Sequence, residues 1–277
     1  MTPLTYPNAQ QEAALLEQAQ RLRASYAAFP KPTPEPYERS AWRQLKGYVE
    51  FALERPPKAF DWREHVPVPP AKFQGDCYSC TSFAAAATIE IATMITYNTQ
   101  APDVAAQYLH TCVVHRGNGN PAEICSFGIE PRRLLMLLKE TGYAVSLSDA
   151  TPFPPMSCSE VGTYTTMRGF SEVPVAAARA RLTREPIVTD MYVWDDFFDY
   201  TTLRAPSYSP NMLLGEPRLH SVCVVGYTAD AWTIKNSFGS GWGDGTGFGR
   251  IKMGTCGLLT DNPPPGWARR PAYTVQV

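Results

Sequence analysis

The fold is decided by the stretch Gln74-Gly75-Asp76-Cys77-Tyr78-Ser79-Cys80-Thr81-Ser82-Phe83, which runs directly into a dense series of small and apolar residues that ends at Ile91. We predict that this series forms a helix that is apolar on most faces and is therefore buried. Cys80 falls at the start of the helix, where the positive end of the helix dipole favours the thiolate. Because the thiolate is the nucleophilic form of cysteine, Cys80 is a candidate catalytic residue.

A thiol nucleophile needs a base, and the chain has four histidines. His220 lies directly before an apolar run, residues 221–227, that is typical of a strand, and Asn236 directly follows the next such run, residues 231–235. Adjacent antiparallel strands would bring Asn236 beside His220. Its side-chain oxygen could then accept the imidazole N–H and fix the tautomer.

Taken together, these motifs resemble the papain-like cysteine peptidases, the family that includes the cathepsins, from about Phe60 to Leu258. They stand in the family's order, and the separations from Cys80 are typical of the family, slightly above it for Asn236. The resemblance implies an α+β, papain-like two-lobe fold. A helical left lobe would carry Cys80, a β-barrel-like right lobe would carry His220 and Asn236, and the active-site cleft would lie between them.

The resemblance also implies a reaction, which is peptide-bond hydrolysis by an endopeptidase through a thioester on Cys80. It makes His220 the general base and later the general acid, and Asn236 the residue that orients it. It makes Gln74 the side-chain donor of the oxyanion hole, together with the backbone N–H of Cys80. No cofactor and no metal is implied.

Three further residues would bind substrate according to the same resemblance. The backbone of Gly128 would pair with an extended substrate, and Leu219 would supply a carbonyl on the facing wall. Asp261 would lie at the base of the second specificity pocket, where a carboxylate would admit Arg or Lys at P2. Three positions depart from the family pattern, namely Tyr78, Thr81 and Phe238.

The seven cysteines make an odd count, so at least one thiol is free. By itself, Cys77-x-x-Cys80 could be a redox pair or half of a zinc site. A second possible zinc site, judged by residue type alone, consists of His110, Cys112, His115 and Cys125. The resemblance instead pairs Cys77 with Cys125 and Cys112 with Cys158, which leaves Cys80 free. We expect Cys223 and Cys256 to be buried free thiols.

The chain divides into an N-terminal helical and Pro-rich extension, residues 1–57, and a peptidase domain, residues 58–277. Apolar stripes predict helices over residues 9–29 and 40–53 around a stiff Pro-rich connector. The extension could be an inhibitory cover over the cleft, a permanent helical layer packed on the fold, or a flexible segment that serves secretion or binds a partner. We expect that part of it covers the active site, which would make the chain self-inhibiting.

Composition limits the partners. A formal net charge of -1 provides no basic field for nucleic acid, and no apolar run is long enough for a membrane span. We expect a monomer that acts on a peptide or protein substrate. No signal peptide is visible, whereas two disulfides favour an extracellular or periplasmic location over the cytoplasm.

Two other functions fit the same sequence. A transpeptidase or other acyl transferase would share the machinery and replace water by an amine. A catalytically silent papain-fold binding protein would explain the departures at Tyr78 and Thr81.

Overall fold

The computed structural model describes residues 56–145, 158, 163–263 and 266–277. The helices predicted over residues 9–29 and 40–53 lie outside these ranges. Within the described ranges, no helix combines the length and the apolar character that crossing a membrane requires.

The helices are α3 (Cys80–Tyr97), α4 (Ala106–Tyr108), α5 (Pro121–Ile124), α6 (Pro131–Thr141) and α7 (Ala178–Leu182), with one π-helix, η2 (Leu109–Val114). Short 3-10 helices are η1 (Trp62–Glu64), η3 (Val175–Ala177), η4 (Asp195–Phe197) and η5 (Met212–Leu214). The strands are β1 (Phe60–Asp61), β2 (Tyr143–Val145), β3 (Thr163–Thr165), β4 (Gly169–Glu172), β5 (Ile187–Val193), β6 (Arg218–Tyr227), β7 (Ala231–Lys235), β8 (Phe248–Lys252) and β9 (Ala272–Gln276).

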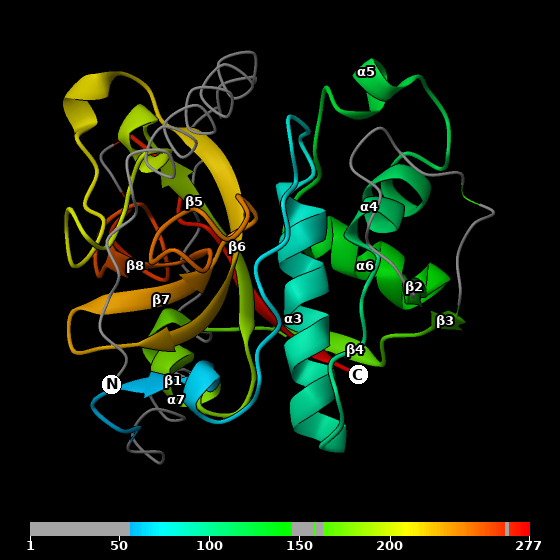
Figure 1. Ribbon diagram of the computed structural model, residues 1–277, viewed down its shortest axis with the longest axis horizontal. Helices are drawn as coiled ribbons and strands as arrows, with labels where there is room; N and C mark the ends of the chain where they lie inside the picture. Colours follow the sequence, from blue (N-terminus) through cyan, green and yellow to red (C-terminus); the bar gives the residue numbers. More distant parts are fainter. Residues whose placement is uncertain (1–55, 146–157, 159–162, 264–265) are drawn as a thin grey trace.

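The molecule has a helical part and a sheet part, which meet along α3. Figure 1 shows α4, α5 and α6 on one side of α3, and strands β5 to β8 on the other. Each part has its own hydrophobic core, built around Leu134 and Leu135 in the helical part and around Ile187 and Val224 in the sheet part. The two-lobe α+β fold that the resemblance implies is therefore confirmed.

The main sheet is antiparallel with the order β4-β9-β5-β6-β7-β8, and β1 pairs with β6 outside this path. Among the described strands the path does not close, so the expected barrel-like lobe is an open sheet. The reason lies at the outer edge of β8, where the loop residue Tyr208 takes the ladder bonds. Its N–H donates to the Arg250 carbonyl at 2.7 Å, and its own carbonyl accepts from the Lys252 N–H at 2.9 Å.

Helix α3 is buried on most faces, as its small and apolar residues predict. Phe83 and Ile89 pack in the core shared with α6, whereas Ala87 and Ile91 pack against Cys223 of β6. The small side chains allow the helix to lie close to the sheet. Because Ile89 is fully buried, its replacement by alanine would cost about 2–5 kcal/mol of unfolding free energy.

One charge is buried on α3. Glu90 is 1% exposed, and Lys72 donates to its Oε1 at 2.8 Å while the Lys235 Nζ lies 3.6 Å from its Oε2. Burial lowers the pKa of Lys235, and the nearby Glu90 carboxylate opposes that shift. A carboxylate here needs these cations, because an unpaired buried charge is costly.

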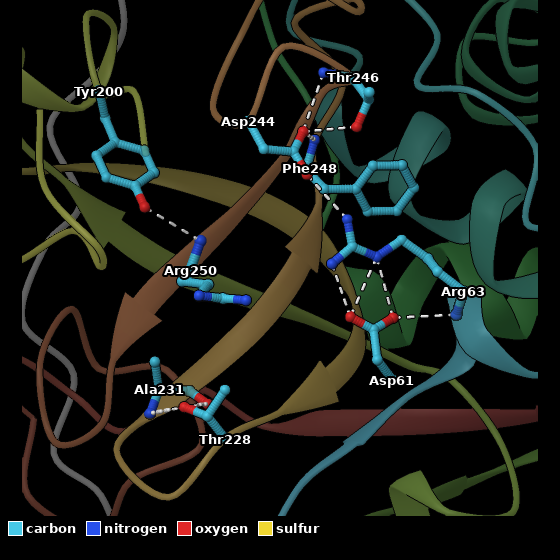
Figure 2. Close-up of polar contacts among 9 residues, drawn as sticks. All are labelled: Asp61, Arg63, Tyr200, Thr228, Ala231, Asp244, Thr246, Phe248 and Arg250. Atoms are coloured by element: carbon cyan, nitrogen blue, oxygen red, sulfur yellow. Dashed lines mark hydrogen bonds and ion pairs between the residues drawn. The ribbon is translucent and has the colours of Figure 1, made fainter. Parts of the chain in front are cut away.

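The start of the domain is fixed by Arg63. Figure 2 shows its guanidinium between two carboxylates, with Nη2 2.7 Å from Asp61 Oδ2 and Nη1 2.9 Å from Asp244 Oδ2. The same guanidinium lies over the Phe248 ring at 4.7 Å from its centroid. Asp61 is the last residue of β1, and Asp244 lies in the loop between β7 and β8. The contacts of Arg63 therefore join β1 to the β7–β8 hairpin.

Candidate active site

The loop before α3 holds Cys80 at the first position of the helix. The Phe83 N–H donates to the Ser79 carbonyl at 3.1 Å, and Cys80 itself is 8% exposed. A disulfide joins Cys77 in this loop to Cys125, and a second joins Cys112 to Cys158. These are the two pairings that the resemblance implies.

The remaining cysteines, Cys80, Cys223 and Cys256, are free and buried. The two pairings exclude a Cys77–Cys80 redox pair, and they also remove Cys112 and Cys125 as zinc ligands. The described residues contain no cluster of three or more His, Cys, Asp or Glu side chains suited to a metal.

His220 on β6 and Asn236 directly after β7 meet as the strand pairing predicts. Asn236 Oδ1 lies 2.7 Å from His220 Nε2, which places the proton on Nε2 by hydrogen-bond assignment. His220 is 0% exposed, and burial lowers its pKa to about 4 although the Asn236 bond opposes the shift. The Phe238 ring lies 4.8 Å from the imidazole, centroid to centroid, and covers this pair.

The sulfur of Cys80 interacts with Ser221, the residue that follows His220 on β6. The main chain and hydroxyl of Ser221 and the hydroxyl of Thr81 favour the thiolate, whereas the Asp190 carboxylate disfavours it. Burial is the largest effect, and the pKa of Cys80 is raised. Burial thus opposes the effect that the helix start is expected to have on this pKa.

Gln74 links the two parts of the site and is 0% exposed. Its Nε2 donates to the Cys77 carbonyl at 2.7 Å, and its Oε1 accepts from the Ser237 hydroxyl at 2.6 Å. Its N–H also donates to the Ser237 carbonyl at 2.9 Å. The amide is thus held between the loop that leads to Cys80 and the residue that follows Asn236.

Gly128 lies against the loop before Cys80. A Cβ at this position would lie 2.7 Å from the Tyr78 carbonyl oxygen, which is closer than real Cβ contacts, so the approach requires glycine. Leu219 is half-buried on β6 and pairs with Tyr192 of β5. Leu219 directly precedes His220, and Gly128 lies against Tyr78, two positions before Cys80.

Asp261 lies apart from these contacts. Its side chain is 38% exposed, and the Nε of Arg269 lies 3.7 Å from its Oδ1. The carboxylate therefore already has a cation of this chain beside it.

Sequence reasoning missed the polar group behind Cys80, which consists of Asp190, Ser221 and Arg270. The Ser221 hydroxyl donates to Asp190 Oδ1 at 2.5 Å, and Arg270 Nη2 donates to Asp190 Oδ2 at 2.9 Å. The signal in the sequence was an aspartate inside the otherwise apolar run that forms β5. A charge there requires a nearby partner.

A family model described as papain family cysteine protease matches residues 56–263. Cysteine proteinase 1 of Entamoeba histolytica is 25% identical over 231 residues, which cover 78% of this chain and 70% of that protein.

Solved structures show the same fold. The Carica candamarcensis cysteine protease CMS1MS2, in complex with E-64, aligns with a TM-score of 0.60 and 24% identity, covering 79% of this chain and 98% of that one. Procathepsin B S9 from Trypanosoma congolense aligns with a TM-score of 0.65 and 17% identity, covering 99% of this chain and 100% of that one.

Proposed function

Since the chain belongs to the papain family of cysteine proteases, we propose that it is an endopeptidase that hydrolyses peptide bonds through a thioester on Cys80. His220 Nδ1 takes the proton from the sulfur as the sulfur attacks the scissile carbonyl. The imidazolium then gives that proton to the leaving amine, and water hydrolyses the thioester by the same route. The oxyanion is stabilised by Gln74 Nε2 and the backbone N–H of Cys80.

One observation carries this proposal. His220 bonds to Asn236, and Ser221, the next residue after His220, interacts with the thiol of Cys80. This arrangement supports the assignment of His220 as the base and Cys80 as the nucleophile of one site. The bond from Nε2 to Asn236 assigns the proton transfer to Nδ1. Burial raises the pKa of the Cys80 thiol and lowers the pKa of His220 to about 4.

The test is cleavage of a dibasic fluorogenic peptide by the Cys80→Ala variant under reducing conditions. We expect kcat to fall by at least about a thousandfold, because the covalent route is lost. Cys223→Ala is the matched control, since it removes another buried thiol, and it should retain activity. Near wild-type cleavage by Cys80→Ala would end the proposal.

We propose that Asp261 contributes a preference for Arg or Lys at P2. The support is its partly exposed carboxylate, and Arg269 competes for that charge. Asp261→Asn should lower kcat/KM for a substrate with Arg at P2 and leave one with Leu at P2 unchanged. Equal effects on both substrates would remove Asp261 from the specificity pocket.

We further propose that residues 1–57 cover the cleft of a peptidase domain formed by residues 58–277. The alignment with procathepsin B S9, a proform, covers 99% of this chain and so extends beyond the family match. A chain that begins at Ala59 should hydrolyse peptides faster than the full chain and bind active-site inhibitors more tightly. The same rate and affinity in both chains would reject the cover.

The two disulfides support an extracellular or periplasmic location, in an oxidising compartment. We also propose that the protein works as a monomer. Fractionation of the native source under thiol-blocking conditions, followed by sizing, tests both points. Recovery from the cytoplasm with reduced cysteines would contradict the location.

A further inference from the structure

The main chain of Tyr78 belongs to the helical part of the molecule. Its N–H donates to the Cys125 carbonyl at 3.4 Å, and the disulfide from Cys77 to Cys125 holds the preceding residue to the same segment. A Cβ at Gly128 would lie 2.7 Å from the Tyr78 carbonyl oxygen and 3.8 Å from the Tyr78 Cβ. The side chain of Tyr78 therefore starts beside Gly128, two residues before Cys80.

The ring of Tyr78 reaches the sheet part. It is half-buried and packs against the hydrophobic core of that part. Among the described hydrophobic residues before residue 173, only Phe60 of β1 and Tyr78 pack against this core. The core includes Phe197 and Phe238, whose rings lie 5.7 and 4.8 Å from the imidazole of His220, centroid to centroid. One side chain thus crosses from the helical part to the core that contacts His220.

A charge on the sheet part shows where the phenol end of the ring lies. Burial raises the pKa of Tyr78, and the positive charge of Arg218 opposes that shift. Arg218 lies on β6 two residues before His220, and its Nη1 donates to Asp195 Oδ1 at 2.6 Å. The packing of the ring and the effect of this charge agree that the side chain points towards the start of β6.

An extended substrate would have to pass the same place. In the proposed function its backbone pairs with Gly128 and with the Leu219 carbonyl, and Cys80 attacks the carbonyl of the substrate residue called P1. Leu219 directly follows Arg218, so the two backbone contacts lie near opposite ends of the Tyr78 side chain. The P1 side chain and the phenol ring therefore compete for the space between these contacts.

We propose that Tyr78 is a specificity-determining residue that narrows the substrate site beside Cys80 and restricts P1 to glycine or another small residue. The inference rests on the proposed function and adds a second position to its preference at P2. A peptide with Arg at P2 and Gly at P1 is then a fast substrate, and a dibasic peptide is a slow one, because repulsive contacts discriminate between substrates as effectively as attractive ones.

The first experiment compares two fluorogenic peptides that both carry Arg at P2 and differ only at P1, where one has Gly and the other Arg. For the wild-type full chain we expect kcat/KM to be at least about tenfold higher with Gly. Tyr78→Ala should raise kcat/KM for the Arg peptide by at least about tenfold and change it for the Gly peptide by less than about threefold. Tyr97→Ala, which removes an exposed tyrosine at the end of α3, should leave the ratio unchanged.

Two further variants separate the volume of the ring from its other properties. Tyr78→Phe keeps the ring and removes the hydroxyl, so its P1 preference should match that of the wild type. The same relaxation in Tyr78→Phe as in Tyr78→Ala would overturn the role of the ring. Tyr78→Leu keeps an apolar contact with the sheet part and shortens the side chain, so the relaxation should also appear there if Tyr78→Ala does not fold.

The second experiment needs no peptide turnover. Cys80 of the full chain is alkylated with iodoacetamide and with a bulky pyrene maleimide, and the modified peptide is quantified by mass spectrometry. Both reagents react with the thiolate, so the ratio of their rates is independent of the ionisation of Cys80. The ratio of maleimide to iodoacetamide rates should rise at least about tenfold in Tyr78→Ala, where the steric barrier is removed, and stay unchanged in Tyr97→Ala.

The two hypotheses can fail separately. A wild type that hydrolyses no peptide rejects the proposed function. An active wild type that cleaves the Arg and Gly peptides equally well rejects this inference alone. The same holds for an active wild type whose P1 preference and alkylation ratio are both unchanged in Tyr78→Ala.

Discussion

Asn236 Oδ1 lies 2.7 Å from His220 Nε2, and this bond joins the end of β7 to the start of β6 across the sheet. The imidazole is thereby held in one orientation beside the residue that contacts the thiol. Phe238 covers it, with ring centroids 4.8 Å apart, so water is kept from the bond.

Asn236→Ala should lower kcat by roughly 10–100-fold with little change in KM. The bond is to a ring that becomes charged during turnover, and such bonds are worth about 1.5–3 kcal/mol. Steady-state kinetics on a fluorogenic peptide measures kcat and KM separately. Asn262→Ala, at an exposed position, is the control, and an equal loss in both variants would contradict the role of Asn236.

Gln74→Ala should lower kcat by about 10²–10³-fold, because one donor of the oxyanion hole is removed. Gln74 also bonds to Ser237, so structural damage must be separated from lost catalysis. Ser237→Ala breaks that bond and keeps the Gln74 donor, so it should retain most activity. If both variants lose activity to the same degree, the amide acts only as a structural link.

Gly128→Ala should destabilise the domain by about 1–3 kcal/mol and raise KM, because the new Cβ would meet the Tyr78 carbonyl at 2.7 Å. Gly169→Ala is the comparison, since its Cβ would meet only the end of the Gln276 side chain, at 3.1 Å. Urea unfolding and peptide kinetics of the two variants give the answer. Equal stability of both variants would show that the loop of Tyr78 moves away from the new Cβ without loss of unfolding free energy.

Stability should fall as the pH drops from about 6.5 towards 4. Burial lowers the pKa of His110 to about 4, and the charge of His115 adds to the shift. Between these pH values the unfolded chain binds a proton that the folded chain does not, so each such histidine costs about 1.4 kcal/mol per pH unit. Below about pH 4 the folded state also binds the proton, and the loss levels off.

Urea unfolding at several pH values measures this slope. His110→Gln should flatten it, because the buried ring that must remain neutral is gone, whereas His65→Gln changes an exposed ring and should not. An unchanged slope in His110→Gln would assign the acid sensitivity to other groups. Burial also lowers the pKa of His220 to about 4, so His220 would be the first of these other groups to test.

The residues of the candidate site that could be found in the sequence are those that belong to short local motifs. Cys80 stands at a helix start, and His220 and Asn236 stand at strand ends, so each can be recognised from its neighbours. Such features need only a few adjacent residues.

The features that were missed depend on tertiary contacts. Asp190 meets Ser221 only through the register of β5 and β6, and Arg270 arrives from the far end of the chain. Thr81 could be noted as a departure, but its bond to Ile129 could not be foreseen. The ionisation of Cys80 depends on burial, which the helix dipole argument left out. The open sheet follows from Tyr208 pairing with β8, and no local pattern indicates that bridge.

The Cys77–Cys125 disulfide has a consequence for where the enzyme can work. The loop that delivers the reduced sulfur of Cys80 is itself tethered by an oxidised cysteine three residues earlier. An environment that is too oxidising converts the nucleophile to sulfenic acid, and one that is too reducing opens the tether that fixes Gly128 beside Tyr78. If Cys80 is the nucleophile, as proposed, activity is expected only within a range of redox potentials whose two limits are set by Cys80 and by the Cys77–Cys125 disulfide.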